Sequence, residues 1–294
     1  MTVDRRVLAD LVEFARIEQE SHDLEPWAEL INALDLPRER KLWVLWLYNA
    51  YDNFGSAWTA YAMFPTPQAW AAAPAHAQRL VADLAIERER RNLFGGRMLK
   101  RYQSYCDLLA GDSQVGWLSR AFQPPTGDWE KNWDQMLAHT RQVWGVGRQA
   151  SFEWTEFLAK CDPWFGAVMD AGDACLWESS GPRKCLERIY NLTEPNRAHL
   201  EMHAKACRIH LKNEGVDLAW VDFETVICDF NVMRDGRYYP GRHLAALAEE
   251  VAGIEVLEHA YRQIIPEPWR SGIQPGIDKE LAKVYARTGR IVTP

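Results

Sequence analysis

The stretch RERKLWVLWLYNAYDNFGSAWTAYAMF, residues 38–64, is typical of one long helix. Pro37 directly before it suits the first turn of a helix, and Pro65-Thr66-Pro67 directly after it stops the pattern. The same spacing of apolar residues recurs along the chain, as at positions 7, 8, 11, 14 and 15 of segment 3–20. Further helices are expected at 76–90, 96–110, 128–144, 148–160, 182–190, 196–213, 219–233 and 241–263, and a short one after the loop 264–276. Alternating strand-like runs are nearly absent, so the sequence predicts an all-α protein of ten or more helices.

The composition is that of a globular protein, because 47% of the 294 residues are hydrophobic and 26% are charged. The net charge of −7 argues against a surface coated in positive charge. Charges throughout the first twenty residues argue against a signal peptide, and the most apolar run, Leu42–Tyr48, is too short to cross a membrane. Six cysteines without a CxxC pair indicate reduced thiols, so we expect a cytoplasmic protein. No linker divides the chain, so we expect a single domain over 1–294, with two helical lobes.

Tryptophan is abundant in the chain, and basic residues are concentrated in two segments. The chain holds 14 tryptophans, which form either a tryptophan-rich core or a cleft in which bases stack on the rings. Segments 79–101 and 183–212 each hold seven basic and three acidic residues. Each segment either binds a phosphate backbone or is an ordinary solvated helix face.

The segment VWGVGRQA, residues 143–150, places a Gly-x-Gly between two helical runs. A tight turn there would leave the first amides of the second helix pointing outward, which is a site for an anion. This is the pattern of the hairpin in helix-hairpin-helix DNA-binding modules, where the amides grip one phosphate. The alternative is an ordinary turn between two helices with glycine caps. Gln149 stands where DNA glycosylases of this class usually carry lysine, which disfavours a Schiff-base mechanism.

A second candidate runs from Asp173 to Lys184, DACLWESSGPRK. Ser180 is expected to cap a helix that opens at a proline and continues with Arg183 and Lys184. Hydroxyls, amides and two cations at one helix start suit a phosphate or diphosphate. The alternative is a well-capped surface helix. Asp173 is the carboxylate just upstream of it.

A third candidate begins with Glu224 and Cys228 on one helix face and ends in the turn GRYYPG, residues 236–241. This turn is either a binding loop or a tyrosine-rich connection packed on the core. Separately, His199, His203, Cys207 and His210 share one helix face, but one straight helix cannot surround a tetrahedral ion. We therefore expect packed or solvated histidines and no metal site. The four-cysteine spacing of iron–sulfur glycosylases is absent.

Taken in order, these segments resemble a phage family, the thymine-hypermodifying amino acid:DNA transferases, or α-glutamyl/putrescinyl-thymine pyrophosphorylases. The resemblance also includes the aromatic segment 47–58 and Arg90-Arg91-Asn92, and it spans roughly residues 47 to 241. It implies a fold like that of helix-hairpin-helix DNA glycosylases, with two helical lobes around a cleft. It also implies that the protein modifies double-stranded phage DNA in the cytoplasm of an infected bacterium and has no membrane partner.

The reaction that the resemblance implies is displacement of diphosphate from 5-diphosphomethyluracil by the amine of an amino acid, such as glycine, or a polyamine. Its implied roles are catalysis by Asp173, Glu224 and Asp229; DNA binding by Gly145, Gly147, Arg148, Arg91 and Asn92; diphosphate binding by Ser180, Arg183, Lys184 and Arg237; and a base pocket of Tyr48, Tyr51, Trp58 and Tyr238. The resemblance implies no certain cofactor, and assistance by Mg²⁺ is left open. Two other functions also stay open, a DNA glycosylase and a non-catalytic DNA-binding protein.

Overall fold

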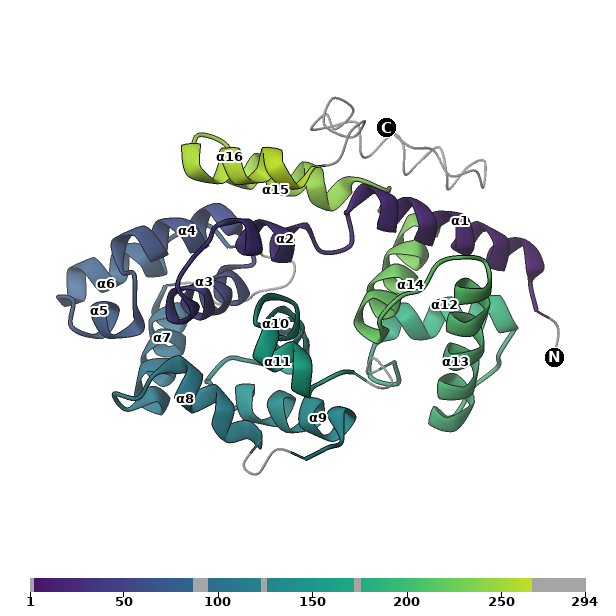
Figure 1. The fold of residues 1–294 in the computed structure, drawn as a ribbon, viewed down its shortest axis with the longest axis horizontal. Coiled ribbons are helices and arrows are strands. Elements are labelled where there is room, and N and C mark those ends of the chain that lie inside the picture. Colours follow the sequence, from purple (N-terminus) through teal and green to yellow (C-terminus); the bar gives the residue numbers. More distant parts are fainter. Residues whose placement is uncertain (1–2, 87–94, 123–125, 172–175, 266–294) are drawn as a thin grey trace. The chain divides into compact units, whose positions relative to one another are not determined.

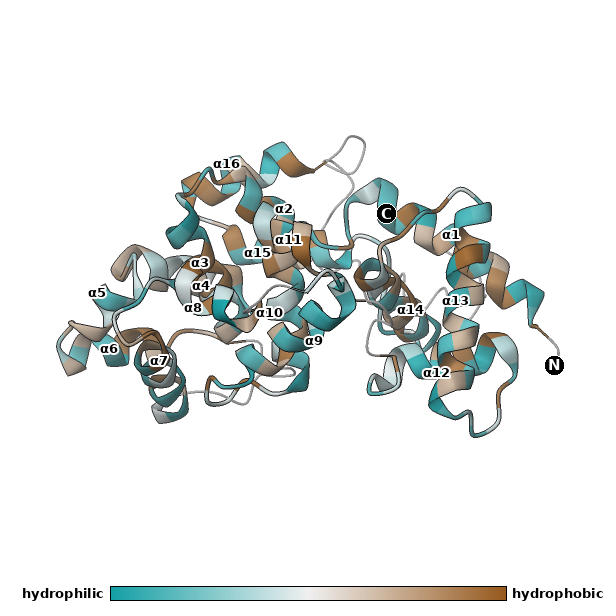
Figure 2. Ribbon diagram, turned by 60° about the horizontal axis from the view of Figure 1, so that its bottom comes forward, coloured by the Kyte–Doolittle hydropathy of each residue, from teal (hydrophilic) through white to brown (hydrophobic). Residues whose placement is uncertain are grey.

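The computed structural model describes residues 3–86, 95–122, 126–171 and 176–265 (Figure 1). Every regular element in these ranges is a helix, which confirms the all-α prediction. Within the same ranges, no helix combines the length and the apolar character that a bilayer crossing requires. Hydrophobic and hydrophilic residues alternate along helices such as α1 and α13 (Figure 2), as expected where one face is buried.

The chain groups into two compact units, each with its own core. The first unit takes residues 1–26, 171–249 and 262–294, and the second takes 27–170 and 250–261. The first unit therefore combines both ends of the chain with a segment from its second half. Helices α15 (Arg242–Val251) and α16 (Glu255–Ile264) contribute residues to both units.

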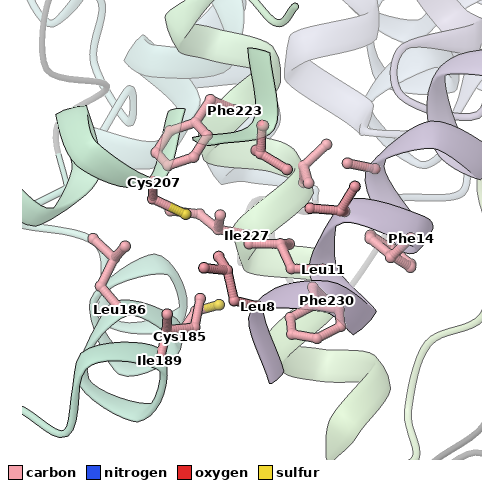
Figure 3. Close-up of a cluster of buried hydrophobic side chains, with 14 of the residues drawn as sticks. Leu8, Leu11, Phe14, Cys185, Leu186, Ile189, Cys207, Phe223, Ile227 and Phe230 are labelled. Atoms are coloured by element: carbon pink, nitrogen blue, oxygen red, sulfur yellow. The ribbon is translucent and has the colours of Figure 1, made fainter. Parts of the chain in front are cut away.

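In the described part of the chain, the first unit contains most of α15 and the whole of α1 (Arg5–Ser21), α12 (Ser180–Tyr190), α13 (Arg197–Asn213) and α14 (Trp220–Arg234). The Asp4 carboxylate caps α1 by accepting hydrogen bonds from the next amides. Helix α14 packs against α1 and α12. Figure 3 shows the resulting core, in which Leu11 of α1, Ile189 of α12, Cys207 of α13 and Ile227 of α14 meet with their side chains fully buried. The apolar stripe read from α1 therefore faces the core.

The second unit has an aromatic core. Its helices are α2 (Pro26–Ala33), α3 (Arg38–Tyr51), α4 (Phe54–Met63), α5 (Pro67–Ala71), α6 (Ala75–Ala82), α7 (Gly96–Leu109), α8 (Gln114–Ser119), η1 (Arg120–Phe122), α9 (Trp129–Thr140), α10 (Arg148–Cys161) and α11 (Pro163–Val168). Trp46 lies parallel to both Trp43 and Tyr105, with ring centroids 4.9 and 4.7 Å away. The core interpretation is thus confirmed for six tryptophans: Trp43, Trp46, Trp70, Trp117, Trp133 and Trp154.

The expected long helix 38–64 is wrong, because the chain breaks between α3 and α4. Asp52 adopts a left-handed conformation with φ 51°, and the Asn53 side chain accepts a hydrogen bond from the amide of Ser56 as the cap of α4. The expected helix 241–263 likewise divides into α15 and α16, and the helix expected at 128–144 ends at Thr140. The helices expected at 96–110, 148–160, 182–190, 196–213 and 219–233 are confirmed to within two residues at each end. Helices α2, α5, α8 and α11 were not expected from the periodicity.

Candidate functional site

The start of α12 lies directly against α14. A Cβ atom added to Gly181 would come within 2.9 Å of the Cys228 sulfur, so only glycine allows this close approach. Glu224 lies one turn before Cys228 on α14, and Asp229 follows Cys228 directly. The fold thus brings the basic start of α12 next to the acidic residues of α14, which were expected to act in one site.

Ser180 is not the cap of α12, in contrast to the sequence-based expectation. Ser180 is the first residue of the helix, and Ser179 occupies the cap position with no side-chain capping hydrogen bond. Arg183 is half-buried, with its Nε 3.6 Å from Oε1 of Glu187 one turn along, and Lys184 is exposed. Arg183 therefore ends the first turn of α12 and Lys184 begins the second, both near the positive end of the helix dipole.

The two predicted site residues of the turn 236–241, Arg237 and Tyr238, differ in their exposure to solvent. Arg237 is exposed, and its guanidinium lies 3.5 Å from a carboxylate oxygen of Asp235. Tyr238 is buried, with its ring packed edge-on against Phe14 at a centroid distance of 5.9 Å. The turn thus exposes a cation while a tyrosine anchors it to the core.

The Tyr238 hydroxyl belongs to a buried polar cluster that the sequence did not reveal. Its oxygen lies 2.7 Å from Oδ2 of Asp23 and 3.0 Å from Oε2 of Glu18. Asp23 also accepts the backbone amides of Gly241 at 2.8 Å and Leu244 at 2.7 Å. Asp23 therefore joins the end of α1 to the turn and to the start of α15.

Burial raises the pKa of both acids in this cluster. The pKa of Asp23 rises to about 6, since loss of solvent outweighs the hydrogen bonds from Leu244, Tyr238 and Gly241. The pKa of Glu18 rises well above its usual range, first through burial and then through the negative charges of Asp23 and Asp229. A hydroxyl has one hydrogen, so Tyr238 can donate to one carboxylate at a time. A protonated Glu18 donating to Tyr238, which in turn donates to Asp23, supplies one hydrogen for each of the two contacts.

His243, the second residue of α15, completes the cluster. Its Nδ1 lies 3.0 Å from the main-chain oxygen of Asp23, and its Nε2 lies 3.8 Å from Oδ2 of Asp229. The side chains of His243 and Asp229 are each 12% exposed, whereas those of Glu18 and Asp23 are fully buried. Histidine and aspartate thus form the edge of the cluster that reaches solvent.

The glycine hairpin belongs to the second unit. Helix α9 ends at Thr140, Gly145 takes a φ of 81° that favours glycine, and α10 begins at Arg148 after the exposed Gly147. The neighbouring Val143 and Val146 are buried and hold the turn on the core. No side chain caps α10 at Gly147, where an added Cβ atom would meet open space. The turn therefore presents the amide end of α10 at the surface.

A family model described as amino acid:DNA transferase matches residues 14–237, which is most of the chain. The chain belongs to the amino acid:DNA transferase family. No curated protein matches the chain. Membership makes the protein a transferase whose substrates are an amino acid and DNA. The match covers both the hairpin of the second unit and helices α12 to α14 of the first.

The residues of the expected base pocket of this amino acid:DNA transferase come from both units, with Tyr48, Tyr51 and Trp58 in the second and Tyr238 in the first. Tyr51 is fully buried, and its hydroxyl lies 2.7 Å from both the Val81 carbonyl and the Tyr102 hydroxyl. Tyr48 is buried too, whereas Trp58 is half-buried beside Tyr61. Tyr48, Tyr51 and Tyr238 therefore serve as core residues in this conformation, and a stacking role for Trp58 stays a prediction.

Some of the other predicted residues lie within the described part of the chain and some lie outside it. Asp173, Arg91 and Asn92 lie outside the described residues. Within the described ranges, no group of three histidine, cysteine or acidic side chains is arranged to hold a metal ion. On α13, His203 and Cys207 are buried while His199 is exposed. None of the five cysteines in the described part of the chain forms a disulfide bond.

Two features of the basic segments differ from a simple phosphate-binding face. Arg101 is fully buried and donates to Oδ1 of Asn49, so it adds nothing to a surface of positive charge. In segment 183–212, Arg188 pairs with Asp235 and Arg197 pairs with Glu201. The surface cations that remain near the α12–α14 contact are thus few and specific in position.

Proposed function

We propose that this transferase displaces diphosphate from 5-diphosphomethyluracil in double-stranded phage DNA with the amine of an amino acid or polyamine. A C–N bond forms at the 5-methylene carbon, the C–O bond to diphosphate breaks, and its electrons leave with diphosphate. The match to the amino acid:DNA transferase family supports the transfer of an amino acid to DNA. The diphosphate leaving group and the thymine-derived target are part of the proposal.

The contact between α12 and α14 carries this proposal. Arg183 and Lys184 lie within the first five residues of α12, and Gly181 brings the first turn against the helix that holds Glu224 and Asp229. Departure of diphosphate builds negative charge on its oxygens, which cations and a helix start stabilise. An incoming ammonium must lose a proton, which requires a base nearby. The contact between the helix that carries these cations and the helix that carries these carboxylates supports a site for both the diphosphate and the incoming ammonium.

The remaining roles follow from the geometry of DNA. We assign the hairpin, with its exposed Gly145 and Gly147 and its half-buried Arg148, to a backbone phosphate, which would position the duplex without reading its sequence. The target base sits inside the helical stack, so the enzyme must flip it out before the methylene carbon is reachable. The exposed ring of Trp177, just before α12, is a candidate to stack on the flipped base or to fill the gap that the base leaves in the duplex. Trp177 was not among the residues predicted from the sequence.

The test is to incubate the protein with DNA that carries 5-diphosphomethyluracil and a pool of amino acids. Mass spectrometry of the released nucleosides should show an aminated thymine, with one diphosphate released for each nucleoside formed. DNA that carries 5-hydroxymethyluracil is the matched control and should stay unchanged. Release of a free base would instead indicate a glycosylase, and binding without any change would indicate a non-catalytic DNA-binding protein. Asp173 lies outside the described residues, and we expect Asp173→Asn to lose product formation while it keeps DNA binding.

A further inference from the structure

The histidine at the start of α15 is held in one tautomer. A carbonyl oxygen only accepts hydrogen bonds, so His243 Nδ1, which lies 3.0 Å from the Asp23 carbonyl oxygen, carries the hydrogen. In the neutral ring, Nε2 then holds the lone pair, and Nε2 is the nitrogen that faces Asp229 at 3.8 Å. The backbone thus prepares His243 to accept a proton on the side where Asp229 lies.

The surroundings of this histidine are negative. Glu18 from α1, Asp23 from the segment after α1, and Asp229 from α14 all face the cluster, and the Tyr238 hydroxyl lies 3.5 Å from His243 Nδ1. Oε1 of the fully buried Glu18 has no hydrogen-bond partner in the described part of the chain. Buried carboxyls of this kind are stabilised either by protons or by a cation. An ammonium group is the cation that the proposed reaction brings.

The position of the pair also suits the reaction. Asp229 directly follows Cys228, whose sulfur lies against Gly181 in the first turn of α12. Successive helix residues differ by about 100° in direction, so Asp229 projects from the face of α14 next to the one that contacts α12. The side chains of His243 and Asp229 are each 12% exposed, and the Asp229 oxygen that faces His243 is buried, so an amine would approach the pair from its exposed edge.

We propose that His243 is the base that deprotonates the incoming amine and that Asp229 holds the ammonium beside it. This inference rests on the proposed function and names the residues that act on its second substrate. The ammonium gives one proton to Nε2, which leaves a neutral amine and an imidazolium next to the Asp229 carboxylate. The nitrogen lone pair then forms the C–N bond while the C–O bond to diphosphate breaks. The second proton of the new ammonium passes to solvent.

The test compares His243→Gln with the wild type from pH 6 to 10, with glycine as the amine and with hydroxylamine, whose nitrogen is largely unprotonated at neutral pH. With glycine at pH 7, we expect the variant to lose about 10²- to 10⁴-fold in single-turnover rate. This loss should shrink as the pH rises and glycine deprotonates in solution. With hydroxylamine at pH 7, the variant should come within about tenfold of the wild type, since no proton needs to be removed first.

Three controls keep the outcomes distinct. His199→Gln changes an exposed histidine on α13 and should match the wild type at every pH. Asp229→Asn should raise the KM for glycine more than it changes the KM for hydroxylamine, because hydroxylamine carries no charge.

An equal loss of rate in His243→Gln with both nucleophiles at all pH values would mean that His243 is structural, and an undiminished rate would also overturn the proposal. If Asp173→Asn shows the pH-dependent recovery in place of His243→Gln, Asp173 is the base. If the wild type itself forms no aminated nucleoside, the proposed function fails, and this inference fails with it.

Discussion

The contact between α12 and α14 can be tested by one added methyl group. In Gly181→Ala, the new Cβ atom would lie 2.9 Å from the Cys228 sulfur, whereas the next atoms of Cys228 lie at an ordinary 3.9 Å. Carbon atoms normally keep about 3.5–4.0 Å from their neighbours, so the sulfur must move or the helices must separate. Overpacking of this kind costs about 1–3 kcal/mol. Alanine in a helix gains up to about 1 kcal/mol over glycine, so we expect a net loss of about 1 kcal/mol of unfolding free energy.

The sign of the effect should reverse when the sulfur is removed. In a Cys228→Ala background, Gly181→Ala meets no sulfur, so only the gain in helix propensity remains and the protein should become slightly more stable. Urea unfolding of the four proteins in the double-mutant cycle gives the coupling between the two positions, which should be about 1–3 kcal/mol. Gly147→Ala is the control, because its Cβ atom would meet open space, and it should change stability by less than about 0.5 kcal/mol.

The same variant also probes the proposed site. If α12 shifts to make room for the methyl group, Arg183 and Lys184 move relative to α14, so diphosphate release should slow in Gly181→Ala and recover in the double variant. Additive effects of the two substitutions, with no change of sign, would refute the close approach of these helices.

Three other predictions follow from single side chains. Glu18 keeps its proton to higher pH in the folded than in the unfolded chain, so the stability it contributes is complete below its ordinary pKa and is lost as the pH rises. Relative to Glu18→Gln, the wild type should lose about 1.4 kcal/mol of unfolding free energy per pH unit above pH 5, until the pH passes the folded-state pKa. Parallel curves of unfolding free energy against pH for the two proteins would contradict the raised pKa. Trp46→Ala removes a fully buried ring and should cost about 3–5 kcal/mol in urea unfolding, whereas the exposed Trp129→Ala should cost less than about 0.5 kcal/mol. Arg148→Ala should weaken binding to all DNA sequences alike and reduce the salt slope by about one, and a loss confined to one sequence would argue against a phosphate contact.

The helices were predictable because their signals are local. Apolar spacing located α7, α10, α12, α13 and α14 to within two residues of their ends. The break between α3 and α4 was missed because the aromatic pattern continues across it. Its signal was present in Asp52-Asn53, two residues that favour turns and caps over a helix interior.

The acidic cluster was missed because its members are far apart in the sequence. Asp229 and Tyr238 were singled out, but Glu18, Asp23 and His243 were not, and only the fold brings position 18 near position 243. One local sign existed: Glu18 follows Leu11, Phe14 and Ala15 at helical spacing, so it lies on the apolar face of α1. A carboxylate on a buried face requires an explanation, since acidic side chains are almost never fully buried without partners.

The partners of Asp23 and Glu18 explain the two burials differently. Asp23 accepts two backbone amides and a tyrosine hydroxyl, so it fastens the end of α1 to the start of α15, and architecture alone accounts for it. Glu18 has one oxygen bonded to Tyr238 and the other without a partner in the described residues, so it adds little to the fold for the cost of its burial. An apolar side chain there would stabilise the core at least as well. What Glu18 does supply is negative charge or a proton near Asp229, which under the proposed reaction helps to hold the incoming ammonium and its proton.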